Sequence, residues 1–291
     1  MAVIPLGGCL FRSRKVERKI SLAPLKTATQ EELIGYINSQ AAAVKSLQAT
    51  VDIDTSVGGE KKGKITDYQQ IRGYVLLRKP AMLRMIGLMP VVRNRAFDMV
   101  SNGQEFKLWI PPKNRFVEGR NDIQPNNTKQ SLENLRPQHI YDALLVREID
   151  SKNEIGVMRS DFETISDAKG HTTEQPDYEV TVSRKENGRW FWSRTVIFSR
   201  MDLLPHRQLI YDHEGNLATD VRYEGYKDYN GASVPSQIQI KRPQEEYDIT
   251  LTILKLQVNE PMGDDKFALQ PPPGAEIQHL DQPRSQAQKT E

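Results

Sequence analysis

The chain has 291 residues, of which 37% are hydrophobic and 27% are charged, and its formal net charge is +2. These values fit a globular protein with a sizeable core, and the charge balance does not point to nucleic acid as a partner. The single cysteine excludes an internal disulfide and a cysteine-rich metal site. No stretch approaches the ~20 apolar residues of a membrane-spanning helix.

The start of the chain carries a short apolar run followed by the only cysteine. Leu6, Gly7, Gly8 and Cys9 stand in the order of a bacterial lipobox, in which small residues precede a cysteine that accepts a diacylglyceryl group. We therefore expect residues 1–8 to be the remainder of a signal peptide and Cys9 to be the lipid-attachment site, which anchors the protein to a membrane. The alternative is an incidental thiol in a disordered N-terminus.

A basic segment follows the cysteine. Residues 9–28 contain a cluster of arginines and lysines opposed by Glu17 alone, and we expect them to form a flexible tether. Each near-surface charge is worth about 1 kcal/mol at an anionic membrane, although a solvated arm is the simpler interpretation. Residues 29–280 are expected to form one folded domain, and residues 281–291 a disordered polar tail.

A helix is predicted at the start of the domain. Thr29 and Glu32 have the spacing of a capping box, and apolar residues then recur at helical spacing over four to five turns. The apolar stripe consists of Leu33, Ile37, Ala41, Val44 and Leu47. Such a stripe must lie on another element.

Alternating apolar and polar residues predict β-strands over most of the remaining domain. The first block covers residues 49–57, 70–78, 82–88, 96–100 and 106–110, and Asn102-Gly103 predicts a hairpin turn. The pattern breaks between 118 and 150, where Pro137 can begin a short helix that extends to Leu145. Strands return from 178 to 258, and a change of phase at Ile253 predicts a β-bulge. The chain is therefore mainly β (α+β).

Three segments resemble the LolA/LolB-like superfamily of envelope lipoprotein carriers and receptors. Residues 73–84 (GYVLLRKPAMLR) are similar to its glycine, strand, basic pair, proline and arginine pattern, and residues 100–109 (VSNGQEFKLW) to its hairpin. Residues 267–277 (FALQPPPGAEI) are similar to its closing segment. The resemblance implies a strongly curved antiparallel half-barrel sheet with helices covering its concave face, and lipid acyl chains held between them.

The resemblance also implies site residues. The expected cavity lies under the first helix, lined by Leu33, Ile37, Ala41 and Val44 of the helix and by Val51, Ile53, Val75 and Leu77 of the strands. Arg78 and Lys79 match the position of a basic residue that holds the helical lid in the family. The alternative is that both are solvated charges at the end of a strand. Ile86, Leu88 and Met89 match an apolar loop that touches the membrane, and core strand ends are the alternative.

No catalytic, metal or cofactor motif is present in the sequence. The five histidines show no metal-ligand spacing, and there is no nucleophile elbow, P-loop or dinucleotide fingerprint. Together with the lipobox, the resemblance to the LolA/LolB-like superfamily implies a non-catalytic lipoprotein of the bacterial cell envelope, facing the periplasm from the outer membrane, that binds acyl chains of lipids or lipoproteins. A sensor or scaffold that binds an envelope protein through the same fold is the alternative.

Overall fold

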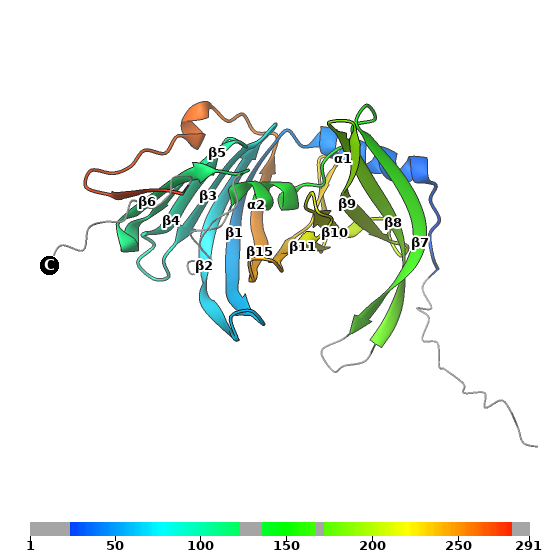
Figure 1. Ribbon diagram of the computed structural model, residues 1–291, viewed down its shortest axis with the longest axis horizontal. Coiled ribbons are helices and arrows are strands. Elements are labelled where there is room, and N and C mark those ends of the chain that lie inside the picture. Colours follow the sequence, from blue (N-terminus) through cyan, green and yellow to red (C-terminus); the bar gives the residue numbers. More distant parts are fainter. Residues whose placement is uncertain (1–23, 123–135, 167–171, 281–291) are drawn as a thin grey trace, which may run out of the picture.

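The computed structural model describes residues 24–122, 136–166 and 172–280 (Figure 1). The lipobox residues Leu6, Gly7, Gly8 and Cys9, most of the predicted tether and the predicted tail lie outside the described residues. The last residues of the predicted tether are fixed to the domain, since the Lys26 amide donates to the Arg200 carbonyl at 2.7 Å. None of the described helices is long and apolar enough to cross a bilayer.

The described residues form two α-helices and sixteen strands. The helices are α1 (Gln30–Ala43) and α2 (Pro137–Leu144), with 3-10 turns η1 (Pro111–Lys113) and η2 (Asp264–Phe267). The strands of the first block are β1 (Ser46–Gly59), β2 (Lys64–Arg78), β3 (Met82–Leu88), β4 (Arg95–Ser101), β5 (Glu105–Ile110) and β6 (Arg115–Arg120). Those of the second block are β7 (Glu154–Ser166), β8 (Thr172–Glu186), β9 (Arg189–Ser199), β10 (Pro205–Tyr211), β11 (Leu217–Glu224), β12 (Lys227–Tyr229), β13 (Ala232–Val234), β14 (Gln237–Arg242), β15 (Tyr247–Val258) and β16 (Glu276–His279).

Fourteen of these strands form one sheet in the order β16-β6-β5-β4-β3-β2-β1-β15-β14-β11-β10-β9-β8-β7. All neighbours are antiparallel except β16 and β6, and the sheet's two end strands, β16 and β7, are not paired with each other in the described structure. Figure 1 shows the sheet bending so that the β2–β6 limb and the β7–β9 limb stand on either side of α2. The mainly β prediction is confirmed, as one large open sheet.

The first helix begins where its capping box places it. The Thr29 hydroxyl accepts from the Glu32 amide, and the Glu32 carboxylate accepts from the Thr29 amide at 2.7 Å. The helix ends at Ala43, earlier than the apolar stripe indicated, because Val44 is extended and Leu47 already pairs with Leu77 in the sheet. The side chains of Val44 and Leu47 are nevertheless buried. The helical spacing of the apolar residues therefore continues past the end of the helix by chance.

The predicted β-bulge is confirmed in the pairing of β1 with β15. Thr50 pairs with Lys255 but Val51 pairs with Ile253, which leaves Leu254 as the extra residue. Because of the bulge, Ile249 and Leu251 before it and Leu256 and Val258 after it pack toward the same core, although simple alternation would put the two pairs on opposite faces.

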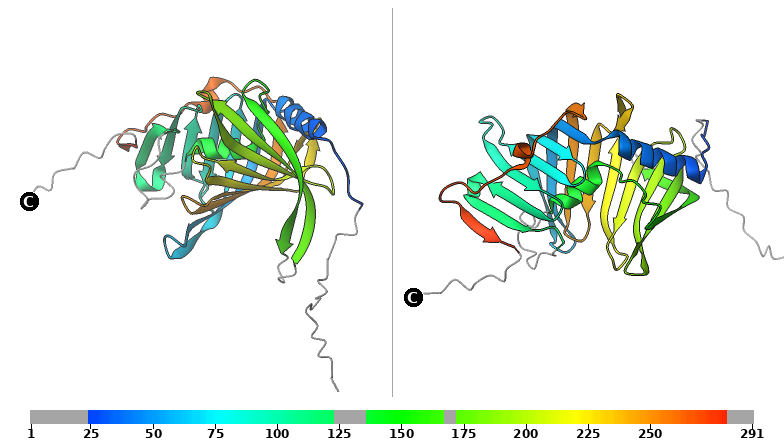
Figure 2. Two further views of the ribbon diagram at one scale, coloured as in Figure 1. Left: turned by 45° about the vertical axis from the view of Figure 1, so that its right-hand side comes forward. Right: turned by 90° about the horizontal axis from the view of Figure 1, so that it is seen from above.

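The helices pack on different limbs of the sheet. Leu33 and Ile37 of α1 join a cluster with Val180 and Phe198 of β8 and β9. Ile140, Ala143 and Leu144 of α2 belong instead to the main core, with side chains of β1–β5, β11, β14 and β15. The view from above separates α1 from α2 in the same way (Figure 2). The expectation that the helices cover the concave face is therefore not confirmed, because α1 packs on β8 and β9 at one end of the sheet.

Two glycines allow β2, β3 and β4 to pack closely. A Cβ on Gly73 would lie 2.5 Å from the Ile86 carbonyl oxygen, and one on Gly87 would lie 2.4 Å from the Phe97 ring. Such approaches are closer than a side chain tolerates, so these positions need glycine. The space at Gly87 is occupied by the Phe97 ring, which lines the cavity described below.

We predict that Gly73→Ala lowers the free energy of unfolding by about 1–3 kcal/mol, because the added methyl group overpacks a buried strand. Gly35, exposed within α1, has nothing within 4 Å of its Cβ position, so Gly35→Ala should raise stability by about 0.5–1 kcal/mol. Urea denaturation of both variants measures the difference. Equal stability of the two variants would contradict the close approach of β2 and β3.

Candidate functional site

An apolar cavity of about 490 Å³ lies between α2 and the β1–β5 limb of the sheet. Its wall is almost entirely hydrocarbon and thioether. The main lining side chains are Ile53, Ile71, Met85, Phe97, Met99 and Ile140. A wall of this kind offers few directional contacts, so it suits a flexible aliphatic ligand, each buried CH₂ of which is worth about 0.8 kcal/mol.

Strand alternation places the lining residues on one face. Met85 and Met99 are directly paired across β3 and β4, and Ile53 and Ile71 are paired across β1 and β2. Leu108 and Ile110 continue this surface on β5, and Ile140 closes one side of the cavity from α2. The alternation of β3, β4 and β5 was visible in the sequence, but only the packing of α2 shows which part of the face stays uncovered.

The loop after β3 reaches the mouth of the cavity. Met89 and Pro90 line it, while Val91 and Val92 next to them are 97% and 62% exposed. Of the three residues expected in a membrane-contact loop, Met89 lies in this loop, whereas Ile86 and Leu88 lie in β3. The exposed apolar tip is therefore shifted toward Val91, and a membrane role for it stays a prediction.

The space beneath α1 is nearly filled by the protein's own side chains. Ile37, Ala41 and Val44 face a cavity of only about 40 Å³. Leu33 packs against β8 and β9. Among the strand residues expected to line the site, Val51, Val75 and Leu77 are buried in the core, and Ile53 alone reaches the larger cavity. The expected cavity under the first helix is thus displaced to the far side of α2.

Lys79 contacts the end of α1. Its ammonium group donates to the Ala41 carbonyl, one of the last four carbonyls of the helix, which have no partner within it. Partial burial lowers the pKa of Lys79, and the charge of Glu148 opposes that shift. Arg78 points elsewhere, donating to the Met262 carbonyl at 2.7 Å and pairing with Asp264. Lys79 therefore contacts the end of α1 and Arg78 contacts the segment before η2, and control of a helical lid by either residue stays a prediction.

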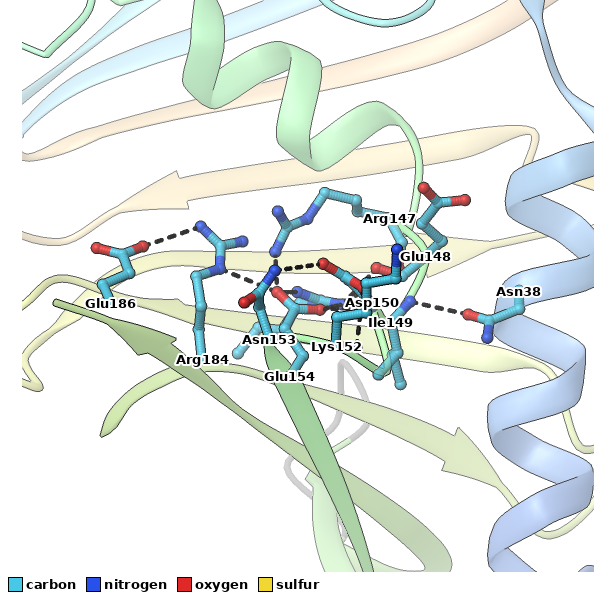
Figure 3. A network of polar contacts seen from close by, with 11 residues as sticks. Asn38, Arg147, Glu148, Ile149, Asp150, Lys152, Asn153, Glu154, Arg184 and Glu186 are labelled. Atoms are coloured by element: carbon cyan, nitrogen blue, oxygen red, sulfur yellow. Dashed lines mark hydrogen bonds and ion pairs between the residues drawn. The ribbon is translucent and has the colours of Figure 1, made fainter. Parts of the chain in front are cut away.

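A charged network fixes the connection between α2 and β7 (Figure 3). Glu154, whose side chain is 2% exposed, accepts hydrogen bonds from Arg147 at 2.6 Å, from Arg184 at 3.0 Å and from Arg194 at 3.2 Å. A buried carboxylate persists only when it is paired and hydrogen-bonded in this way. The spacing of these residues in the sequence gave no signal of the cluster.

The same connection is tied to the first helix. The Asn38 side chain on α1 accepts from the Ile149 amide at 2.8 Å (Figure 3). The two helices are therefore linked through residues 145–153, although they pack on different limbs of the sheet.

Comparison with known proteins supports the fold. The chain is similar to a LolA superfamily protein from Nitrosomonas europaea, with a TM-score of 0.51 at 12% identity over 84% of this chain and 99% of that one. It is also similar to a DUF1329 family protein from Desulfovibrio piger, with a TM-score of 0.50 at 12% identity over 81% and 95% of the two chains. A putative outer membrane lipoprotein-sorting protein domain from Vibrio parahaemolyticus matches with a TM-score of 0.47 at 12% identity, over 81% and 94%.

No protein-family model matches the sequence. No curated protein matches it either. At 12% identity the solved structures establish a shared fold, and the resemblance to the LolA superfamily is confirmed at that level.

We predict that Lys79→Met accelerates amide hydrogen exchange at the C-terminal turn of α1 about fivefold, because one charged hydrogen bond of about 1 kcal/mol is lost. Lys79→Arg should retain protection, since it keeps a donor near the Ala41 carbonyl. Lys45→Met, at an exposed position in the α1–β1 connection, is the control. Unchanged exchange in Lys79→Met would show that the contact does not hold the helix end.

We also predict that His139 on α2 weakens the fold in acid. Burial, with smaller contributions from the charges of Arg242 and Arg136, lowers its pKa to about 3, below the ~6.5 of an unfolded chain. The unfolded state therefore binds the extra proton, and the free energy of unfolding should fall as the pH drops below about 6.5, by up to about 1.4 kcal/mol per unit. His139→Gln should flatten this slope in denaturation measured from pH 7 to 4, and His213→Gln should not.

Proposed function

We propose that this protein is a non-catalytic cell-envelope lipoprotein that binds acyl chains of a lipid or lipoprotein in the apolar cavity between α2 and β1–β5. The observation that carries this proposal is the cavity itself, with about 490 Å³ of space and a lining of aliphatic, aromatic and thioether groups. The fold shared with a LolA superfamily protein is compatible with such a role.

Attachment through Cys9 completes the proposal. Acylation at Cys9 would anchor the domain, and the part of the predicted tether before Lys26 would connect the two, since Lys26 is already bonded to the domain. Met89 with the neighbouring Val91 and Val92 would face the lipid surface. An exposed apolar tip at the mouth of an apolar cavity offers a short path for an acyl chain between bilayer and protein. We place the protein at the outer membrane, facing the periplasm, and we assign transfer or reception of lipoproteins as its role.

The acyl-binding proposal predicts that Ile71→Trp raises the Kd of a fluorescent fatty-acyl probe at least tenfold. The indole would occupy space that two or more methylene groups need, each worth about 0.8 kcal/mol. Ile65→Trp is the matched control, because Ile65 lies on the same strand, is 67% exposed and does not line this cavity. Delipidated wild-type protein that takes up no probe, or probe binding equal in both variants, would contradict the proposal.

A second candidate function is the binding of an envelope protein. It is favoured by β7, which forms one end of the sheet and exposes Ile155, Val157 and Phe162 by 51–59%. The Met158 amide on this strand donates to the Gln30 side chain of α1 at 3.0 Å, and the remaining part of the described edge can pair with a partner's strand. Crosslinking from β7 that traps a folded partner, together with no acyl-probe binding, would favour this function over the first.

A further inference from the structure

Three side chains of metal-ligand type meet on the β7–β10 limb, away from the apolar cavity. Glu163 on β7, Asp177 on β8 and His206 on β10 each offer a donor atom, and these atoms lie within 4.8 Å of one another. Asp177 is 1% exposed, and the side chains of Glu163 and His206 are 15% and 18% exposed. The cluster is therefore largely shielded from solvent.

The sheet register brings the three residues together. Glu163 pairs with Gln175 across β7 and β8, so Asp177, two residues further along, lies on the same face. The pairing of β9 with β10 shifts between Pro205 and Arg207, which makes His206 the extra residue of a β-bulge. Bulges redirect side chains, and here the imidazole Nε2 lies 3.1 Å from Asp177 Oδ2 while Nδ1 lies 3.7 Å from Glu163 Oε2.

In Asp177 and in Glu163, one carboxylate oxygen accepts hydrogen bonds from neighbouring side chains and the other oxygen accepts none within the described structure. Gln175 donates to Asp177 Oδ1 at 3.0 Å, and Arg207 and Arg222 donate to Glu163 Oε1 at 2.6 and 2.8 Å. Asp177 Oδ2 and Glu163 Oε2 are buried and accept no hydrogen bond from any described residue. His206 can pair with these two oxygens only when its ring is protonated, and otherwise they keep their desolvation cost. Both oxygens face His206.

Hydrogen bonding alone does not satisfy His206. Its Nε2 atom lies 3.2 Å from the Gln175 amide nitrogen, a donor, and 3.1 Å from Asp177 Oδ2, an acceptor. A lone pair on Nε2 suits the amide and repels the carboxylate, whereas a proton there does the reverse. A cation between Nε2 and Asp177 Oδ2 would pair with both of these atoms, and the Gln175 amide would keep its hydrogen bond to Asp177 Oδ1.

The ligand set and its surroundings fit zinc. Imidazole nitrogen and carboxylate oxygen are both zinc ligands, and donor atoms about 2.1 Å from a tetrahedral zinc lie about 3.4 Å apart. His206 Nε2 and Asp177 Oδ2, 3.1 Å apart, already have this spacing. Glu163 Oε2 lies beside Nδ1, so its side chain would have to move toward Nε2 to complete the site. Asp220 pairs with Arg207 at 2.8 Å. The carboxylates of Glu163, Asp177 and Asp220 therefore outnumber the two arginines, Arg207 and Arg222, by one negative charge. This net negative charge favours a divalent cation. Gln175, Arg207 and Arg222 would then orient the ligating carboxylates from outside.

We propose that His206, Asp177 and Glu163 bind one zinc ion, with water completing the coordination, and that this ion connects β7 to β8 and β10. Binding to the folded state alone would stabilise the sheet end in proportion to the zinc concentration. The proposal is independent of acyl binding, because none of the three residues lines the apolar cavity.

The test is a calorimetric titration of chelator-treated protein with Zn²⁺. A Cys9→Ser background removes the thiol as a competing ligand. We expect one zinc per chain with a micromolar Kd, a melting temperature that rises by several degrees with Zn²⁺ and not with Mg²⁺, and at least tenfold weaker binding in His206→Ala and Asp177→Asn. His213→Ala is the matched control, since His213 is an exposed histidine of the neighbouring hairpin and should leave the Kd unchanged.

Circular dichroism of each metal-free variant shows whether it is folded, and His206→Gln replaces His206→Ala if the smaller side chain prevents folding. No saturable zinc binding by the background protein would overturn the proposal. Binding that is unchanged in folded His206 and Asp177 variants, or that is lost equally in His213→Ala, would also overturn it.

Discussion

The arrangement of the interior depends on the packing of α2 against the sheet. A helix of eight residues is too short to be stable by itself, so its formation depends on tertiary contacts. Ile140, Ala143 and Leu144 supply those contacts by joining the main core. The carbonyls near its end are also satisfied from the sheet, since Tyr223 donates to the Ala143 carbonyl at 2.9 Å and Gln208 to that of Asp142 at 3.2 Å.

The position of α2 separates two chemically different spaces. Ile140 faces the apolar cavity, whereas Gln138 and Asp142 face a polar pocket of about 330 Å³ whose walls include Arg147 and Arg194. Burial raises the pKa of Asp142, which a hydrogen bond from Gln138 partly opposes. Because one helix contributes to both walls, its amphipathic character decides which space is lined by hydrocarbon and which by charged groups.

The first helix has a different place from the one that its sequence suggested. Its apolar stripe is real, but it is used against β8 and β9, and the residual space beneath it is small. The contact of Lys79 with the Ala41 carbonyl and that of Asn38 with the Ile149 amide connect α1 to β2 and to the segment before β7. Gln30 and Gln40 accept further hydrogen bonds from the amides of Met158 and Ser233, so α1 is joined to the sheet at several points along its length.

Local patterns in the sequence were sufficient for many of the elements, although the strands β6, β7 and β16 were not predicted. Short-range stereochemistry, which neighbouring residues encode, accounts for four of the predicted features. These are the capping box at Thr29, the turn at Asn102-Gly103, the proline at the start of α2 and the bulge opposite Thr50. Other features depend on residues that lie far apart in the chain. These are the placement of α1 and α2, the uncovered part of the sheet's inner face, and the clusters around Glu154 and His206. Alternation tells which side chains share a face, but only the packed sheet and helices decide which of them are covered, paired or left facing a cavity.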